Sequence, residues 1–168
     1  MKQLLLNAQI TNEGKTFFGS VLIDGERIAA IYQGIMPLTQ IPEEARNAQI
    51  ENCEGLWLFP GVIDDQVHFR DPGLTHKGDI DSESRAAIAG GVTSFMDMPN
   101  TNPQTTTVEA LEHKFADAAR KSIVNYSFYF GATNTNADLL PQLNERRVCG
   151  VKLFMGASTG DMLVNRTE

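Results

Sequence analysis

The chain has 168 residues and a formal net charge of −7, with 42% hydrophobic and 21% charged residues. This composition is ordinary for a globular protein and excludes a largely disordered chain. The acidic balance excludes a general binder of the phosphate backbone, which needs a patch of Lys and Arg. No apolar run approaches the roughly 18 residues of a membrane span, and the amino terminus lacks the apolar region of a signal peptide. We therefore expect a soluble, cytoplasmic protein without nucleic-acid or membrane partners.

Residues 1–57 predict a small, β-rich, sandwich-like domain. Apolar runs at 4–10, 17–23 and 28–32 are separated by turn signals around Gly14 and Gly25. The segment holds no cluster of catalytic residue types. Its cysteine, Cys53, and the distant Cys149 show neither disulfide nor zinc-knuckle spacing, so we expect two buried free thiols, as in a reducing cytosol.

From residue 58 onward the pattern changes to alternating strands and helices. Strand-like runs at 63–69, 93–98, 123–130 and 151–155 begin about thirty residues apart, the size of one βα repeat. Such alternation predicts a parallel sheet with right-handed crossovers. A (β/α)8 barrel of the TIM type takes about 250 residues, so 58–168 hold the first four units of one. We therefore expect an amino-terminal fragment of a longer enzyme, with a free-standing half barrel as the alternative.

Three helices are expected between these strands. The first opens at Asp81 and ends at Gly90-Gly91, and the second begins with a capping box at Thr106. A third covers 137–146. In the second helix, an apolar stripe of Val108, Leu111, Phe115 and Ala118 faces a core. The helix belongs to the outer layer, and His113, with Lys114 beside it, is expected at the surface.

The first strand of the second part has polar and apolar residues in alternation. Successive side chains of a strand point to opposite faces. One face then carries the polar residues Asp64, Gln66, His68 and Arg70, and the other carries Ile63, Val67 and Phe69. A polar face of this kind is typical either of a strand lining a reaction centre or of a hydrated edge strand. His76, in the polar loop that follows, is expected to be solvated.

Four stretches resemble the dihydroorotases, which are metal-dependent members of the amidohydrolase superfamily. The resemblance covers residues from about 56 to the end. In the first stretch the family usually carries His-x-His, and Gln66 stands here at the first of those positions. The stretches are Pro60-Gly61-Val62-Ile63-Asp64 with Val67-His68-Phe69-Arg70-Asp71-Pro72-Gly73, Ala89-Gly90-Gly91-Val92-Thr93, Met96-Asp97-Met98-Pro99-Asn100-Thr101, and 150–160 around Lys152.

The resemblance implies a zinc site of one or two divalent ions, with His68 and Lys152 as ligands. Lys152 lies in an apolar strand, where a bare ammonium would be desolvated or lose its proton. In the family this amine takes up carbon dioxide, and the carbamate bridges two metals. A lysine that snorkels to the strand end or pairs with a carboxylate is the alternative.

Gln66 complicates this metal site, because an amide oxygen is a poor zinc ligand beside an imidazole nitrogen. Three explanations are open. The more exposed metal is bound weakly, or Asp64 or Asp65 compensates, or the site carries a single metal.

Arg70 and Asn100 resemble the pair that holds the carboxylate of dihydroorotate. A guanidinium fork matches a carboxylate in two hydrogen bonds, and a primary amide adds a donor. The alternatives are an ion pair of Arg70 with Asp71 or Asp79, and a turn-forming role for Asn100. Hydantoinases usually lack this arginine, so its presence favours dihydroorotase.

The implied reaction is the reversible hydrolysis of dihydroorotate to N-carbamoyl-aspartate in pyrimidine biosynthesis. The family's two further metal-binding histidines and its proton-shuttling carboxylate come from later strands, so this chain alone is expected to have little or no turnover. The resemblance allows a homodimer of the full-length enzyme. The alternatives are a silent dihydroorotase-like protein that supports a partner, a hydantoinase- or allantoinase-type cyclic amidase, and a plain α/β binding module.

Overall fold

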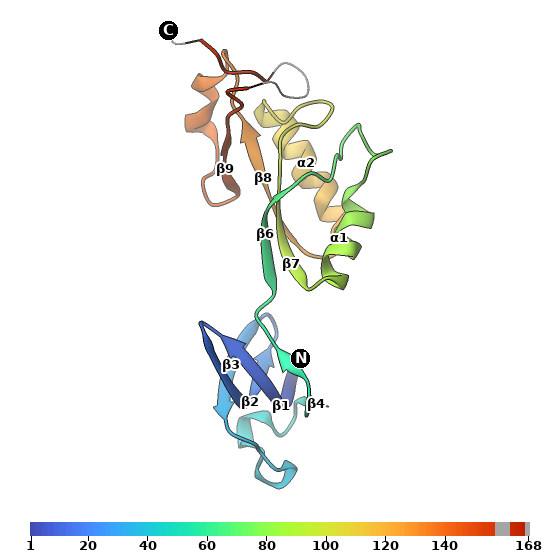
Figure 1. Ribbon diagram of the computed structural model, residues 1–168, viewed down its shortest axis with the longest axis vertical. Helices are drawn as coiled ribbons and strands as arrows, with labels where there is room; N and C mark the ends of the chain where they lie inside the picture. The colour runs from blue at the N-terminus through green and yellow to red at the C-terminus, as the bar shows by residue number, and fades with distance from the viewer. Residues whose placement is uncertain (157–161, 167–168) are drawn as a thin grey trace. The chain divides into compact units, whose positions relative to one another are not determined.

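The structure is a computed structural model that describes residues 1–156 and 162–166. It forms two compact units, Met1–Pro60 and Gly61–Glu168 (Figure 1). No helix within the described ranges is long and apolar enough to cross a membrane. The last residues of the 150–160 stretch lie outside the described part of the chain.

The first unit is a twisted sheet in the order β3-β2-β1-β4, with β5 paired to β1. Strands β1 to β3 form an antiparallel meander, whereas β4 and β5 run parallel to β1. The β-rich first part is thereby confirmed. The elements are β1 (Lys2–Asn12), β2 (Lys15–Asp24), β3 (Arg27–Gln33), the 3-10 turns η1 (Leu38–Gln40) and η2 (Glu43–Ala45), β4 (Gln49–Asn52) and β5 (Trp57–Leu58).

A bulge between Leu5 and Ala8, where Asn7 has φ 61°, reverses the alternation of β1 and places its apolar side chains on both sides of this sheet. One cluster contains Leu4, Leu6, Leu22 and Ala45, and the other contains Ala8, Ile10, Val21 and Cys53. Cys53 is buried, Cys149 is half-buried, and both are free thiols. Burial raises the pKa of each thiol. The predicted free thiols are confirmed, with Cys149 less buried than expected.

The second unit is a curled sheet in the order β6-β7-β8-β9, with every pair of neighbours parallel. Both α-helices lie on the same side of this sheet (Figure 1). A half barrel of the TIM type is the predicted fold, and it is confirmed. The elements are β6 (Val62–Val67), α1 (Ile80–Ala89), β7 (Val92–Asp97), α2 (Val108–Lys121), β8 (Asn125–Gly131), the 3-10 helix η3 (Ala137–Gln142) and β9 (Val148–Lys152).

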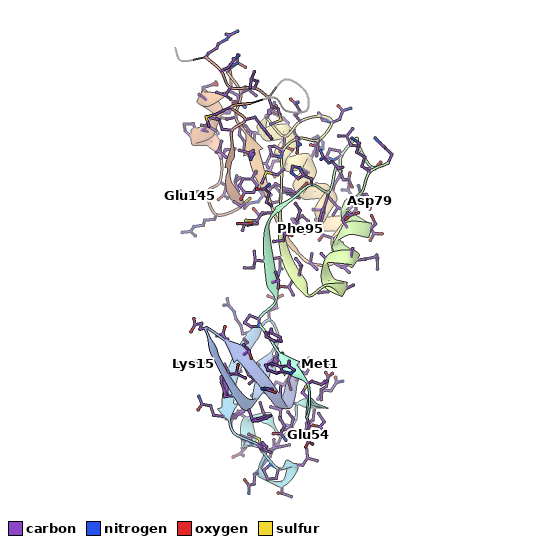
Figure 2. The ribbon with its side chains drawn as sticks, viewed as in Figure 1. Met1, Lys15, Glu54, Asp79, Phe95 and Glu145 are labelled. Carbon is purple, nitrogen blue, oxygen red and sulfur yellow. The ribbon has the colours of Figure 1, made fainter. Side chains whose placement is uncertain are left out.

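The core of this unit lies between the sheet and the two helices. Phe95 of β7 is near the centre of this core (Figure 2). The centroid of its ring lies 4.4 Å from that of Phe69 and 6.3 Å from that of Phe128. The apolar stripe of α2 faces this core as predicted. Leu111 and Ala118 are buried in it, and Val108 and Phe115 are half-buried.

The predicted helix starts were displaced by one or two residues. The side chain of Asp79, not that of Asp81, caps α1 and accepts a hydrogen bond from Ser82 N at 2.9 Å. Likewise Thr107, not Thr106, caps α2. In both helices the cap is the last residue with extended backbone, because only there can the side-chain oxygen reach the free N–H groups of the first turn.

The expected third helix over 137–146 was wrong. This segment holds only the short 3-10 helix η3, which contains Pro141 and ends at Gln142. Proline has no N–H to donate and clashes with the preceding turn, so an α-helix cannot continue through it.

The predicted single polar face of β6 was also wrong. Asp64 pairs with Phe95 and Val67 pairs with Asp97, with a register shift between the two pairs. Phe95 and Asp97 are two residues apart on β7 and share a face. Asp64 and Val67 therefore share a face as well, because the bulge adds one residue and reverses the alternation.

The predicted surface position of Lys114 was wrong too. His113 is exposed, as expected, but the Lys114 side chain is 0% exposed. Its amine forms an ion pair with the carboxylate of Asp97, which is 1% exposed. A charge placed under a helix needs such a partner, because an unpaired buried ion is very costly.

Candidate active site

The residues singled out from the sequence follow the carboxyl ends of three strands of one parallel sheet. His68 comes directly after β6, Asn100 lies in the loop after β7, and Lys152 is the last residue of β9. Because the strands are parallel, these ends lie along one edge of the sheet. This edge is where α/β barrels place their chemistry.

His68 and Asn100 are in direct contact. His68 Nδ1 lies 2.9 Å from Asn100 Oδ1. An amide oxygen can only accept a hydrogen bond, so Nδ1 is the donor, and in the neutral ring Nε2 is then the nitrogen with the lone pair. His68 lies between Val67 and Phe69, which both pack in the core under the helices, and its own side chain is exposed. The imidazole is thus oriented by Asn100 with Nε2 available to a ligand.

Hydrogen bonds join the loops after β6 and β7 on both sides of this contact. Phe69 N donates to Asp97 Oδ1 at 2.9 Å, and Met98 N donates to Val67 O at 3.0 Å. Further along, Asn102 N donates to Pro72 O at 3.0 Å. The two loops therefore form one connected layer beneath His68 and Asn100.

The Asp97–Lys114 ion pair lies within the same layer. Lys114 Nζ is 2.6 Å from Asp97 Oδ2 and donates a hydrogen bond to Met98 O at 3.0 Å. The Oδ2 contact is an ion pair without hydrogen-bond geometry. Burial lowers the pKa of Lys114 by desolvation, and the charge of Asp97 opposes that shift. Sequence reasoning missed this pair, and an acid at the end of a buried strand was the available signal.

Arg70 lies two residues beyond His68, with a left-handed backbone (φ 65°) and a half-buried side chain. The alternative ion pairs are not formed. Asp71 instead pairs with Lys121 at 2.7 Å, and Asp79 caps α1. Among the described residues, the guanidinium of Arg70 has no acidic partner.

Lys152 pairs with Gly131, and Gly150 with Tyr129, across β8 and β9. These positions lie on the face opposite Phe128 and Phe130, which pack under the helices. Lys152 is half-buried rather than buried as expected, because β9 is the edge strand of this sheet. Its amine lies 5.1 Å from the ring centroid of Phe154 and has no carboxylate partner in the described ranges.

A match to the model of the Amidohydrolase family covers residues 57–158. The chain belongs to the amidohydrolase family. It is 39% identical over 147 residues to an allantoinase of Deinococcus radiodurans, covering 83% of this chain and 32% of the relative. It is also 39% identical over 137 residues to a dihydroorotase of Streptococcus pyogenes, covering 82% of this chain and 29% of the relative. The chain thus spans about a third of the length of these relatives.

Solved structures of the family agree with the fold. An L-hydantoinase (dihydropyrimidinase) from Arthrobacter aurescens matches with a TM-score of 0.85 and 25% identity, covering 98% of this chain and 35% of that one. A dihydropyrimidinase from Brevibacillus agri matches with a TM-score of 0.79, 26% identity and the same coverage. The resemblance inferred from the sequence is confirmed at the level of the amidohydrolase family.

Members of this family generally bind divalent metals, and the described residues fit part of such a site. His68 presents a free Nε2, and Lys152 has no acidic partner among the described residues. No group of three or more His, Cys, Asp or Glu side chains in the described ranges is arranged to hold a metal. Within the described part of the chain, His68 and Lys152 are the two donors that the sequence motifs single out, and their assignment as ligands stays a prediction.

The asparagines that follow β8 have structural roles. Asn136 is buried and donates to Thr106 O and Gly131 O, both at 2.9 Å. Asn134 donates to Leu163 O at 3.0 Å and so holds a later segment in place. These hydrogen bonds occupy the side-chain amide groups of both residues.

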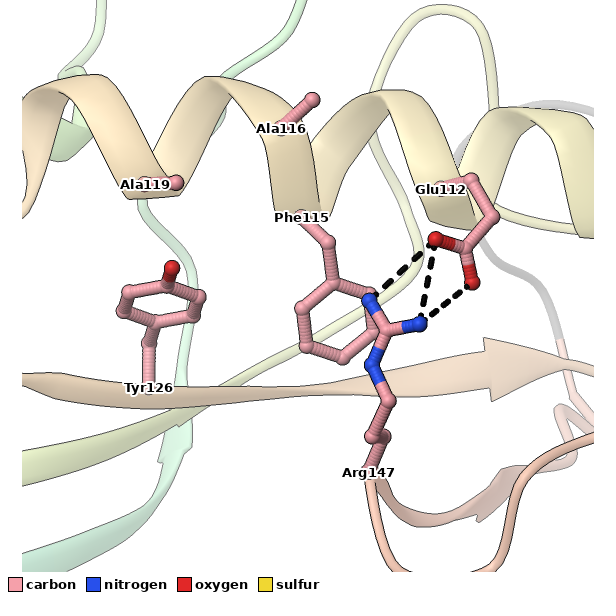
Figure 3. A pocket seen from close by; sticks show the side chains of 6 residues that line it. All are labelled: Glu112, Phe115, Ala116, Ala119, Tyr126 and Arg147. Atoms are coloured by element: carbon pink, nitrogen blue, oxygen red, sulfur yellow. Dashed lines mark hydrogen bonds and ion pairs between the residues drawn. The ribbon is translucent and has the colours of Figure 1, made fainter.

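A hollow of about 460 Å³ lies on the outer layer between α2 and β8. Arg147 reaches across it to Glu112 and stacks on the ring of Phe115, 4.3 Å from its centroid (Figure 3). The two charged side chains that line this hollow, Arg147 and Glu112, pair with each other. The hollow lies on the helix side of the sheet. It is therefore separate from the strand ends that carry His68 and Lys152.

Proposed function

We propose that the complete protein is a zinc-dependent cyclic amidohydrolase that interconverts dihydroorotate and N-carbamoyl-aspartate, a step of pyrimidine biosynthesis. This chain contributes His68 and Lys152 to the metal site, and Arg70 and Asn100 to substrate binding. The observation that carries the proposal is the His68–Asn100 hydrogen bond at the strand ends, beside an arginine without an acidic partner in the described ranges.

A metal ion bound here would lower the pKa of its water toward neutrality and polarise the scissile carbonyl. The residues of this chain would act around it. Asn100 holds the His68 ring so that Nε2 faces outward, and Lys152 offers an amine that carbon dioxide converts to an anionic carbamate. Arg70 supplies two parallel N–H donors, which match a substrate carboxylate.

An allantoinase- or hydantoinase-type amidase is the second candidate. The matched allantoinase is as similar in sequence as the matched dihydroorotase, and the solved structures that match are hydantoinases and a dihydropyrimidinase. Arg70 favours dihydroorotate over these substrates, because a guanidinium without an acidic partner among the residues described is best matched by a substrate that carries a carboxylate.

A silent protein that supports a partner enzyme is the third candidate. Gln66 favours it, because this amide occupies the position where the resembled family has a metal-binding histidine. This candidate differs measurably from both amidase candidates, since a silent protein would bind no zinc and hydrolyse no cyclic amide.

The test is an assay of the complete, zinc-loaded protein on dihydroorotate, allantoin and hydantoin. We expect hydrolysis of dihydroorotate, and a KM about 10- to 100-fold higher in Arg70→Met, the range for a lost hydrogen-bonded charge pair. Arg85→Met is the matched control, because Arg85 is an exposed arginine of α1 that forms an ion pair with Asp81 on its own helix. Turnover of allantoin or hydantoin without dihydroorotate would support the second candidate, and absence of both zinc and turnover the third.

A further inference from the structure

We propose that Asp97 and Lys114 are positioning residues, which hold the loops after β6 and β7 so that the His68 ring keeps its proton on Nδ1 and its Nε2 free. The catalytic meaning of this tautomer rests on the proposed function. The geometry of the pair stands independently of it.

The Asp97–Lys114 ion pair contacts the backbone close to both His68 and Asn100. Asp97 Oδ1 accepts from Phe69 N, the residue after His68, at 2.9 Å. Lys114 Nζ donates to Met98 O, two residues before Asn100, at 3.0 Å. The 2.6 Å ion pair joins these two anchors. One buried unit therefore sets the separation of the two loops on which the imidazole and the amide are carried.

The contacts of His68 and Asn100 themselves make such support necessary. The His68 ring is exposed, and Asn100 Oδ1 is the only hydrogen-bond partner found for it in the described residues. A single hydrogen bond contributes about 1 kcal/mol net. It orients the ring only while the two backbones stay at the required distance, and a shift of the loops would break it.

The energetics of buried ion pairs also point to a positioning role. An apolar pair of similar volume is often as stabilising as a buried ion pair, because desolvation offsets the Coulomb attraction. Stability alone therefore does not explain this pair. An apolar pair could not provide the directed contacts to Phe69 N and Met98 O. The other groups acting on Lys114 are more distant, namely Asp71, Cys149 and the Phe128 ring, whose centroid is 4.8 Å away.

The experiment measures the tautomer of His68 by nuclear magnetic resonance of the imidazole nitrogens. The complete protein is labelled with 15N-histidine, freed of metal and held above the pH at which its imidazoles titrate. The His68 signal is assigned by its loss in His68→Gln. We expect the Nδ1–H form in the wild type. In Lys114→Met the ratio of Nδ1–H to Nε2–H should fall about fivefold, the equivalent of one lost hydrogen bond.

Two further variants keep the result interpretable. Asp97→Asn/Lys114→Met removes both charges and retains an acceptor for Phe69 N, so it avoids an unpaired buried ion. It should still show the shifted ratio, because Met98 O has lost its donor. Leu111→Ala truncates a side chain that is 2% exposed on the same helix without touching either hydrogen bond. It should lower stability and leave the ratio unchanged.

The proposal is overturned if the double variant keeps the wild-type ratio, or if Leu111→Ala shifts the ratio as much as Lys114→Met does. These readouts need neither metal nor turnover. A failure of the proposed zinc chemistry would therefore be seen in the activity and metal assays and not in the tautomer measurement.

Discussion

His68 Nδ1 lies 2.9 Å from Asn100 Oδ1, and this contact joins residues that follow two different strands. The sequence motifs assign the first to metal binding and the second to substrate binding. The hydrogen bond means that the two roles are coupled, because residues in contact rarely respond independently to substitution.

Removing the Asn100 side chain should weaken zinc binding as well as substrate binding. We expect Asn100→Ala in the complete protein to lower zinc affinity about 10- to 100-fold, the usual cost of losing the partner of a metal-binding histidine. Asn100→Asp keeps an oxygen acceptor for Nδ1–H and should retain most of the affinity. Competition with a chelator measures both, and equal affinity for wild type and Asn100→Ala would contradict the prediction.

Lys114→Met should strongly destabilise the second unit. It leaves the buried carboxylate of Asp97 without its cation, which typically costs about 3–5 kcal/mol in the free energy of unfolding. The double variant Asp97→Asn/Lys114→Met should recover much of this loss, because no unpaired charge remains. Urea unfolding followed by circular dichroism compares them, and a double variant less stable than Lys114→Met would be the contrary result.

The cap of α1 should make stability depend on acid pH. The hydrogen bond from Ser82 N lowers the pKa of Asp79. The contribution of its charge is therefore complete above the unfolded pKa of about 3.9, and it is lost as the pH falls through the lower folded pKa. At neutral pH, Asp79→Ala should cost about 1 kcal/mol.

Asp79→Ser is the matched variant for this prediction. Serine keeps an acceptor for the helix N–H groups but does not ionise. Unfolding at pH 7 and pH 3 should show a smaller acid loss in Asp79→Ser than in the wild type. An identical pH dependence in both would show that the charge of Asp79 contributes nothing.

Gly73→Ala should separate the loops after β6 and β7. Gly73 has φ +83°, and a Cβ there would lie 1.8 Å from Asn102 O. The control is Gly14→Ala in the first unit, with φ +73° and nothing within 4 Å of the added atom. Both carry the cost of a left-handed alanine, about 1 kcal/mol, and only Gly73→Ala adds the clash. Urea unfolding should show a clearly larger loss for Gly73→Ala, and equal losses would contradict the close approach.

The sequence by itself determined the fold class and the family. The apolar runs separated by glycine turns predicted a β-rich first unit, and the spacing of the later strands predicted the parallel half barrel. Both patterns are local, since they depend on backbone propensity and on which side of an element is apolar. The strand-end motifs likewise singled out His68, Arg70, Asn100 and Lys152 as candidates, because their order along the chain follows the order of the strands.

Only the tertiary structure decided which side chains meet. Lys114 lies three residues after Leu111 and four before Ala118, on the buried face of α2. Its partner Asp97 belongs to another element, so the ion pair itself could not be predicted from the local pattern. The position of Asp64 depends on a bulge against β7, which reverses a strand's alternation without changing its composition. The hydrogen bond between His68 and Asn100 depends on the register of two strands. Contacts between distant segments arise from the packing of the whole sheet against its helices, so they became visible only in the folded chain.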